Sequence, residues 1–476
     1  MSGTRDGAIG RARAAFSGGQ YLDHLRRLVA VPTESQNPGS AGELRRYCAE
    51  TIPSLLQGLG FAGRVAPNPL PDRGPALIAE RREGAGLPTV LIYGHGDVVR
   101  GMAGRWSDGL DPWAVTIRDD KWYGRGTADN KGQHLIAIEA LRAVLEERGR
   151  LGFNAVLFIE TGEEVGSPGL REIVRRECAG VGADVFIGLD GPRQATMVPE
   201  LRLGCRGGVA FDLRVALRDR AHHSGHWGGV LADPAVLLAH ALASILGEDG
   251  RILVEGWTPA AIPDAVRRAC ASLVFEELPG LPQPDAWWGE PGLTKAERIF
   301  AWTSAVVLAG ITGNPEAPVN AVQAEARLRM QVRHTVDVDG ATIVPALRRH
   351  LDAHGHTRVE IHPVKERDMF PASRTDPDDP WIVALAESLS RSAGVPANLV
   401  PNSSGGNPSA IFAEELGVPV TWIPSGHAGS NQHAPDEHAL SALLGAGLAL
   451  MTGVWWDIGE GRHPPARSRG AGSDRG

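Results

Sequence analysis

The sequence predicts an α/β protein in which helices sandwich a mixed, mostly parallel sheet, with a smaller two-layer α+β domain inserted into the chain. The first observation is a set of short apolar runs at residues 91–93, 156–159 and 185–187. Continuous apolar runs of this length are typical of strands buried on both faces. Second, stretches with helical periodicity separate these runs, as in strand–helix–strand units. Third, apolar and polar residues begin to alternate regularly after residue 204, which is typical of half-exposed strands.

The elements of the first half follow from these patterns. Expected in order are helices at 20–31 and 41–58, strands near Ala76 and Val90, a helix at 133–148, and strands from Val156 and Val185. The helix at 133–148 combines strong periodicity with residues of high helix propensity. The first 20 residues and the last 18 are rich in Gly, Arg and Ser, so we expect both ends to be frayed or disordered.

The second half contains the inserted unit. Expected in order are a strand at 205–219, a helix at 235–245, a strand at 325–336, a helix at 343–354, a strand at 358–364 and a helix at 381–393. The catalytic domain is therefore predicted in two parts, at 20–203 and 373–458. The inserted domain is expected at 204–372, and a disordered tail at 459–476.

Composition narrows the class of protein. A chain of 476 residues exceeds what one core usually supports, so two domains are expected. The net charge of −8 argues against nucleic acid or an anionic membrane as the main partner. Four scattered cysteines without a CxxC pair indicate thiols in a reducing compartment. We see neither a secretory signal nor a continuous run of 18–20 apolar residues. A cytoplasmic protein is expected.

Potential metal ligands follow the apolar runs. They are His95, Asp129, Glu163, Glu164, Asp190 and His433. In open α/β sheets ligands bind outside the carboxyl ends of the strands, so we expect these side chains to converge although they are far apart in the chain. Two imidazoles and several carboxylates in one crevice are typical of a two-metal hydrolytic site.

Each of these motifs also has an ordinary explanation when taken singly. Asp129 is placed to cap the helix that follows, and an exposed pair such as Glu163 and Glu164 is common on surface loops. At the end of an apolar run, however, adjacent carboxylates need neutralisation. One carboxylate would bind metal, and the other would act as general base on a metal-bound water. Asp97 lies two residues from His95 and would hold the free nitrogen of that imidazole.

These residues lie in motifs that resemble the M20 metallopeptidase family, which includes carboxypeptidases, aminoacylases and carnosinase-like dipeptidases. The motifs are GHGDVV, GRGTADNKG, ETGEEVGS, GLDGP, HHSGHWGG and HAPDE, in that order. The resemblance extends over about residues 20 to 455 and implies a zinc-exopeptidase type of fold. It also implies that the inserted domain is a lid and dimerisation domain.

The resemblance implies a role for each candidate ligand. Asp129 would bridge two metals, Glu164 and His433 would complete one site, and His95 and Asp190 the other. Glu163 would be the general base, and Asp97 the carboxylate behind His95. A cis peptide bond is implied between Asp129 and Asn130.

Further residues would contact the substrate. The resemblance implies that His223 reaches the active site of the partner subunit and polarises the scissile carbonyl, and sequence alone leaves its neighbour His222 open as the alternative. Arg333 would bind a substrate carboxylate, and Asn320 would be a polar residue of the lid. The remaining candidates form a Gly-rich loop: Ser404, Gly405, Gly406 and Asn407.

The sequence thus predicts a homodimeric hydrolase with two divalent metal ions per subunit, zinc first and Mn or Co as alternatives. It would cleave an amide or peptide C–N bond in a dipeptide, an N-acyl amino acid or a C-terminal residue. One alternative is a deacylase of a small metabolite. A second is an aminohydrolase of an aromatic amine or ring amide, suggested by the twelve tryptophans. A third is a non-enzymatic metal-binding scaffold.

Overall fold

A computed structural model describes residues 3–277, 282–364 and 370–466. Its largest element is an eight-stranded sheet with the strand order β1-β2-β6-β3-β7-β18-β8-β17. The strands are β1 (Ala62–Ala66), β2 (Ala76–Arg81), β3 (Thr89–His95), β6 (Asn154–Glu160), β7 (Val185–Gly188), β8 (Glu200–Arg202), β17 (Asn398–Val400) and β18 (Val420–Trp422). Strands β6, β3, β7 and β18 at its centre run parallel, whereas β1 and β2 are antiparallel at one side. The mostly parallel α/β fold is confirmed.

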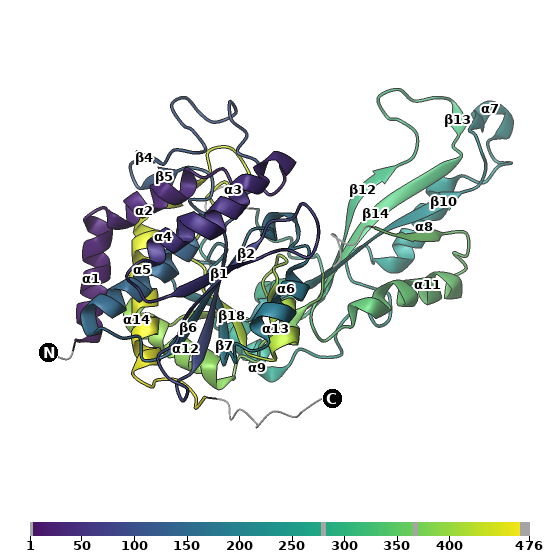
Figure 1. Cartoon of the computed structure of the whole chain (residues 1–476). Coiled ribbons are helices and arrows are strands. Elements are labelled where there is room, and N and C mark those ends of the chain that lie inside the picture. The colour runs from purple at the N-terminus through teal and green to yellow at the C-terminus, as the bar shows by residue number, and fades with distance from the viewer. Residues whose placement is uncertain (1–2, 278–281, 365–369, 467–476) are drawn as a thin grey trace, which may run out of the picture.

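Helices cover both faces of this sheet (Figure 1). One face packs against α1 (Arg5–Ser17), α2 (Gln20–Val29), α5 (Lys131–Arg148), α12 (Pro380–Ala393) and α14 (Ser441–Gly459). The other packs against α6 (Leu170–Cys178) and α13 (Ser409–Leu416). Neighbouring residues of one strand enter different cores: Ile92 faces the α5 side, whereas Leu91 and Tyr93 face α6 and α13. The strands are apolar throughout because both faces are buried.

The predicted disorder of the N-terminus is wrong. Residues from Arg5 onward form α1, whose Ala8 and Ala12 are fully buried in the main core. Arg5 forms an ion pair of 3.1 Å with Asp457 of α14. Small alanine side chains make this contact surface, so a search for bulky apolar periodicity overlooks it. The predicted disorder of the C-terminus falls mainly on residues 467–476, outside the described residues.

Among the described helices, α14 alone is long and apolar enough to cross a membrane by length and composition. Its mean hydropathy is 1.3, but 72% of the window is buried inside the protein. The indole of Trp455 donates a hydrogen bond to the carbonyl of Ala137 in α5. A search for unbroken apolar runs misses α14 because glycine, threonine and serine interrupt it. Its burial is that of a core helix.

A second, four-stranded antiparallel sheet extends away from the first (Figure 1). Its strands, in spatial order, are β12 (Ser304–Ile311), β14 (Glu325–His334), β10 (Gly207–Ala216) and β15 (Glu360–Pro363). The helices α8 (Pro234–Ile245) and α11 (Ile343–Ala353) cover one face and share a separate core with it. We propose that this unit is the inserted domain expected at 204–372.

Two short antiparallel strands mark the place where the chain leaves the large sheet and returns to it. They are β9 (Gly204–Cys205) and β16 (Ser373–Arg374), with Ser373 opposite Cys205. At the far end of the second sheet, β11 (His222–His223) pairs with β13 (Ala321–Val322), next to α7 (Ser224–Trp227). The two ends of the second sheet are therefore held by separate small ribbons.

Part of the tryptophan-rich stretch packs on the large sheet. Helices α9 (Asp264–Ala271) and α10 (Lys295–Phe300) share an apolar cluster with Val400 of β17. The amide of Asn402 donates a hydrogen bond of 2.6 Å to the carbonyl of Phe300. These helices cover the edge of the large sheet although they lie in the middle of the insertion.

The remaining elements are short. They are α3 (Ala41–Arg46), a π-helical turn at Tyr47–Thr51, α4 (Ile52–Leu56), the three-stranded sheet of β4 (Thr116–Arg118), β5 (Lys121–Tyr123) and β19 (His438–Leu440), and 3-10 turns at Pro38–Ser40, Glu163–Val165 and Gly340–Thr342. The helix expected at 41–58 thus exists as one continuous stretch with a π-helical middle.

Candidate metal centre

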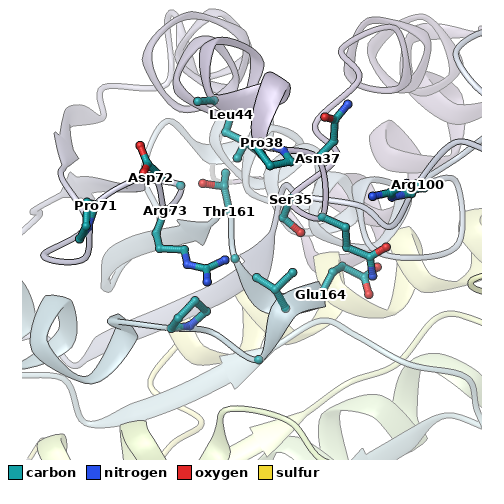
Figure 2. Close-up of a pocket in the computed structure, with 17 residues that line it drawn as sticks. Ser35, Asn37, Pro38, Leu44, Pro71, Asp72, Arg73, Arg100, Thr161 and Glu164 are labelled. Atoms are coloured by element: carbon teal, nitrogen blue, oxygen red, sulfur yellow. The ribbon is translucent and has the colours of Figure 1, made fainter. Parts of the chain in front are cut away.

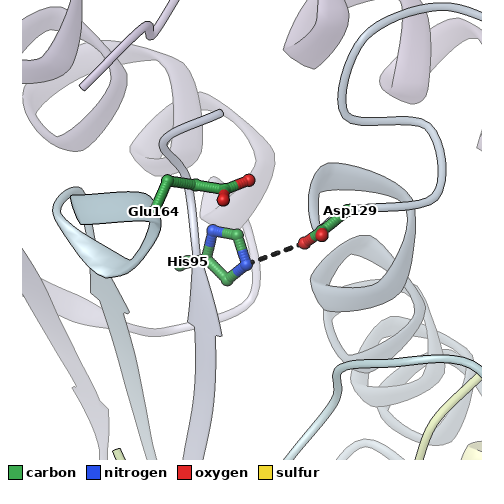
Figure 3. Close-up of side chains that lie close together, drawn as sticks. All are labelled: His95, Asp129 and Glu164. Carbon is green, nitrogen blue, oxygen red and sulfur yellow. Dashed lines mark hydrogen bonds and ion pairs between the residues drawn. The ribbon is translucent and has the colours of Figure 1, made fainter. Parts of the chain in front are cut away.

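Four of the six candidate ligands lie at or just after the ends of strands of the large sheet. His95 is the last residue of β3, and Glu163 and Glu164 form the turn after β6. Asp190 follows β7, and Asp129 precedes α5. Figure 3 shows His95, Asp129 and Glu164 facing one another, with ligand atoms that all lie within 4.8 Å of one another. The parallel central strands bring together residues that are far apart in the sequence.

His95 is fully buried and contacts carboxylates through both ring nitrogens. Its Nε2 lies 3.0 Å from Oδ1 of Asp129 and 3.9 Å from Oδ2 of Asp190. Its Nδ1 lies 3.0 Å from the carbonyl oxygen of Asp97 and 3.5 Å from the carboxylate of that residue. With Nδ1 donating to the carbonyl, the lone pair of Nε2 faces the acidic cluster.

Asp97 holds the Glu163–Glu164 turn as well as the His95 ring. Its two carboxylate oxygens accept hydrogen bonds from the backbone N–H groups of Glu163, at 3.2 Å, and Glu164, at 3.1 Å. Asp97 is fully buried. It therefore fixes the end of β3 against the turn after β6, in addition to its expected position behind His95.

His433 joins the cluster from the loop after β18. Its Nε2 lies 3.3 Å from Asp129 and 3.0 Å from Oε2 of Glu164, while Oε1 of Glu164 is buried without a hydrogen-bond partner among the described residues. The backbone of His433 has φ 62°, and Asn431 and Asp436 in the same loop also have positive φ. Non-glycine residues adopt this conformation rarely and often at functional sites.

Burial and mutual repulsion strongly perturb these groups. Burial raises the pKa of Glu163 and of Asp190, and raises the pKa of Glu164 to about 7. Burial also opposes ionisation of Asp129, but hydrogen bonds with His433 and His95 overcome it and hold that pKa below its usual range. Hydrogen bonds to Asp129 and Glu164 raise the pKa of His433 to about 11. The cluster is a strongly acidic environment that favours positive charge.

The donor set fits divalent cations. Carboxylate oxygens and imidazole nitrogens are ligands that Zn²⁺, Mn²⁺ and Co²⁺ share. Cations placed among Asp129, Glu164 and His433 would offset the charge that burial disfavours, and Oε1 of Glu164 would gain a partner. The candidate ligands from sequence are therefore brought together, and their chemistry is suited to metal.

Glu437 supports the site, although it is not among the site residues predicted from the sequence. Its Oε1 accepts hydrogen bonds from the N–H groups of Gly126, Ala128 and Asp129, at 3.0, 3.1 and 3.0 Å. Its Oε2 pairs with Arg125 at 2.7 Å, and both side chains are fully buried. Glu437 ends the HAPDE motif, and its proximity to His433 in the sequence is the feature that could have indicated its supporting role.

Asn130 is a second supporting residue that was overlooked. A non-proline cis peptide bond joins it to Asp129, as the family resemblance implied. Its side-chain N–H group donates to Oδ1 of Asp190 at 2.8 Å and to the carbonyl of Leu189 at 2.6 Å. Asn130 thus orients one candidate ligand while following another in the chain.

Arg333 and the Gly-rich loop lie together beside β17. Nη1 of Arg333, on β14, is 3.4 Å from the carbonyl oxygen of Ser404, and its guanidinium lies over the ring of Phe370 at 5.3 Å. Gly406 of the loop also packs against Phe370. The side chain of Asn407 accepts a hydrogen bond from the N–H of Ser409, at the start of α13. Arg333, Ser404, Gly405, Gly406 and Asn407 form one surface.

His222, His223 and Asn320 lie elsewhere, at the far end of the second sheet (Figure 1). Ser224 donates its N–H to the carbonyl of Asn320 at 2.8 Å, so His223 and Asn320 are close to each other. His223 is exposed, and its Nδ1 accepts a hydrogen bond from the N–H of Gly225. Within one chain these residues do not join the metal centre.

Sequence comparison agrees with the motifs. A model of "Peptidase family M20/M25/M40" matches residues 91–457. The cysteinylglycine-S-conjugate dipeptidase of Corynebacterium striatum is 29% identical over 88% of this chain and 91% of its own length. The beta-Ala-His dipeptidase of Homo sapiens is 34% identical over 51% of this chain and 50% of its own.

Solved structures share the fold. The dipeptidase Dug1p of Saccharomyces cerevisiae matches with a TM-score of 0.73 and 20% identity, over 97% of this chain and 99% of the other. The M20 metallo-carboxypeptidase Sso-CP2 of Sulfolobus solfataricus matches with a TM-score of 0.75 and 22% identity, over 92% and 99%. Both similarities extend across the two sheets.

Proposed function

The chain belongs to the peptidase family M20/M25/M40, and from this premise we propose that it is a dipeptidase with two divalent cations per subunit. As a family member it is a metal-dependent hydrolase of peptide C–N bonds. The observation that carries the proposal is the convergence of His95, Asp129, Glu164 and His433 at the carboxyl edge of the sheet. Zinc is the first choice of metal because imidazole and carboxylate ligands suit it.

The ligands divide into two sets around Asp129, which would bridge both cations. His433 lies next to Oδ2 of Asp129 and to Glu164, whereas His95 lies next to Oδ1 of Asp129 and to Asp190. When bound, the cations would polarise the scissile carbonyl and lower the pKa of water. Asp97, Asn130 and Glu437 would keep these ligands in place through the hydrogen bonds described above.

Glu163 would carry the proton. Its raised pKa, caused by burial, suits a group that takes a proton from the attacking water and then delivers it to the leaving nitrogen. Asp97 fixes its backbone N–H, so the side chain is positioned by a buried residue. One side chain thereby serves both proton transfers.

Recognition of the substrate carboxylate is proposed for the surface of Arg333, Ser404, Gly405, Gly406 and Asn407. The guanidinium of Arg333 offers a planar pair of donors that matches a carboxylate. Its stacking on Phe370 limits its orientations. A dipeptide with its carboxyl end here would place its peptide bond near the metal centre.

We further propose a homodimer that places His223, or its neighbour His222, at the partner's metal centre. Strand β12 lies at the edge of the second sheet, and Val306, Val307, Leu308 and Ile311 are exposed along it. Exposed apolar edge strands are usually covered, and a second copy would cover this one. His223 would then polarise the scissile carbonyl from across the interface.

The two relatives named above are both dipeptidases, and their similarity covers most of this chain and half of it, respectively. They therefore favour a dipeptide over the other substrates considered. Family membership as a hydrolase removes the non-enzymatic scaffold from consideration. The four cysteines are free and buried, which supports the cytoplasmic location proposed from sequence.

Hydrolysis of dipeptides, N-acyl amino acids and aryl amides by chelated enzyme, reconstituted with Zn²⁺, Mn²⁺ or Co²⁺, tests the proposal. Chelation should abolish turnover and one metal should restore it, with dipeptides the best substrates. Glu163→Gln should keep its metal content, measured by mass spectrometry, and lose about 10²- to 10⁴-fold in kcat. The exposed Glu146→Gln on α5 is the matched control. Full activity of Glu163→Gln would refute the general-base role, and preference for aryl amides would refute the dipeptidase.

A further inference from the structure

A pocket of about 1400 Å³ opens beside Glu164, and none of the roles above uses it (Figure 2). Four segments line it: the loop around Ser35 with the start of α3, the loop around Arg73 before β2, Arg100 after β3, and the turn at 161–168 that carries Glu164. The volume exceeds the roughly 300–1,000 Å³ of typical ligand sites. Because Glu164 is both a pocket wall and a candidate metal ligand, a molecule bound in this pocket would reach the metal centre.

The strand order places this pocket opposite the carboxylate-binding surface. Glu163 and Glu164 follow β6, and the loop of Arg73 leads into β2, the neighbour of β6. The loop of Ser404 follows β17, at the other end of the sheet. The metal centre lies between them, above β6, β3 and β7. A substrate with its carboxyl end at Ser404 therefore extends its amino-side residue toward the pocket.

The charged groups of the pocket favour an anion. Arg73 and Arg100 both line it, and neither has an ion pair or hydrogen bond with another side chain among the described residues. In Figure 2 the guanidinium of Arg73 extends toward Glu164, whereas the carboxylate of Asp72 points the other way. With Glu164 committed to the metal centre, the two arginines dominate the charge inside.

Ser35 adds a neutral polar group. Its Oγ is buried at the pocket wall without a hydrogen-bond partner among residues 3–277, 282–364 and 370–466. Buried hydroxyls are normally paired, so this oxygen is suited to a group of the bound molecule. Two unpaired guanidinium groups and a hydroxyl are the recognition elements of a carboxylate.

We propose that this pocket is the subsite for the amino-side residue of the substrate and that it selects a side chain bearing a carboxylate, as in a glutamyl dipeptide. The inference rests on the proposed dipeptidase function and adds the substrate class to it. Arg73 and Arg100, on opposite sides of the pocket (Figure 2), supply the positive charge that attracts the side-chain carboxylate, and Ser35 donates a hydrogen bond to it. Its volume of about 1400 Å³ is sufficient for a glutamate side chain.

The test compares kcat/KM for Glu–Ala and Gln–Ala with the metal-loaded enzyme. These dipeptides have nearly the same shape, so their ratio isolates the effect of charge. Wild type should favour Glu–Ala by about tenfold, and Arg73→Gln and Arg100→Gln should each lower the ratio by about threefold to tenfold. Arg27→Gln, an exposed arginine on α2 outside the pocket, should leave the ratio unchanged. Arg73→Glu should shift preference toward Lys–Ala.

The outcomes separate the two proposals. Hydrolysis of Ala–Ala and Gln–Ala without preference for Glu–Ala would overturn the subsite and leave the dipeptidase standing. A preference for Glu–Ala that neither arginine variant reduces would also overturn the subsite. Failure to cleave any dipeptide under any metal would instead refute the dipeptidase.

Discussion

At Glu437 one buried carboxylate joins segments that are about 310 residues apart in the chain. Three backbone N–H groups of the loop before Asp129 point at the same oxygen, and Arg125 neutralises the other. An amide side chain could present only one oxygen acceptor, and it would carry no charge. The position of Asp129 therefore depends on a carboxyl group that is not one of the candidate metal ligands.

Glu437→Gln should lower the free energy of unfolding by about 3–5 kcal/mol, because it leaves Arg125 buried without a counter-charge. The loosened loop should also weaken binding of the cations held by Asp129. Urea denaturation and metal titration by equilibrium dialysis measure the two effects. Glu460→Gln, which removes the half-exposed partner of Arg148, is the control and should cost no more than about 1 kcal/mol. Equal losses for both variants would contradict the supporting role.

The sequence predicted the positions of the candidate ligands better than their contacts. His95, Glu163, Glu164 and Asp190 follow parallel strands, and the ends of such strands meet at one edge whatever the loops do. The acceptor role of Asp97 toward two backbone N–H groups depends instead on the fold of a three-residue turn. Such local geometry leaves no periodic trace in a sequence.

At the scale of the element, β7 and β18 pack closely because Gly188 of β7 has no side chain. Gly188 lies opposite Trp422 in this parallel pair, and a Cβ on Gly188 would collide with the indole ring. The ring is buried, and its Nε1 donates a hydrogen bond of 2.7 Å to Oγ of Ser409. The indole is therefore fixed from its other side and has no room to move.

Gly188→Ala should lower the free energy of unfolding by about 1–3 kcal/mol, since the added methyl group overpacks the core between β7 and α13. It should also reduce kcat/KM, because Asp190 follows two residues later and would shift with the strand. Gly42→Ala, at an open position of α3, should leave stability unchanged or raise it by up to about 1 kcal/mol. If Gly188→Ala were as stable and active as wild type, β7 and β18 would be able to accommodate the added methyl group, and the overpacking argument would be wrong.

Elements were predicted well where periodicity was strong and poorly where small residues make the contact. Helix α5 begins at Lys131, two residues before its expected start, and α12 and α8 begin one residue before theirs. Helix α1 was overlooked because Ala8 and Ala12 bury little apolar surface each. The tight packing of α1 on α14 comes from shape, which residue hydrophobicity does not encode.

At the scale of the whole molecule, His223 lies at the far end of the second sheet, next to β13 and α7 (Figure 1), whereas Glu163 lies in the turn after β6 of the large sheet. If they act in the same reaction, they must come from different subunits. Only the family resemblance predicts this arrangement, because nothing in the order of residues specifies which copy of a chain supplies a side chain.

Mixing two inactive variants tests this arrangement. In a hybrid dimer of Glu163→Gln and His223→Ala, one active site contains both mutations and the other contains neither. Random re-association should restore about a quarter of wild-type activity, since half of the dimers are hybrid and each has one intact site. Activity assays after joint refolding, with light scattering for the dimer, provide the measurement. Absence of recovery in proven hybrids would place His223 in the active site of its own chain.

Because β9 and β16 are adjacent, the inserted unit could be replaced by protein engineering. Gly204 and Arg374 face each other, so the two ends of the inserted segment are neighbours on one two-stranded ribbon. Neighbouring ends allow a foreign module to be spliced in, or a tight turn to close the gap, without rerouting the polypeptide beneath. The edge at β17, which α9 and α10 shield, would need a new cover.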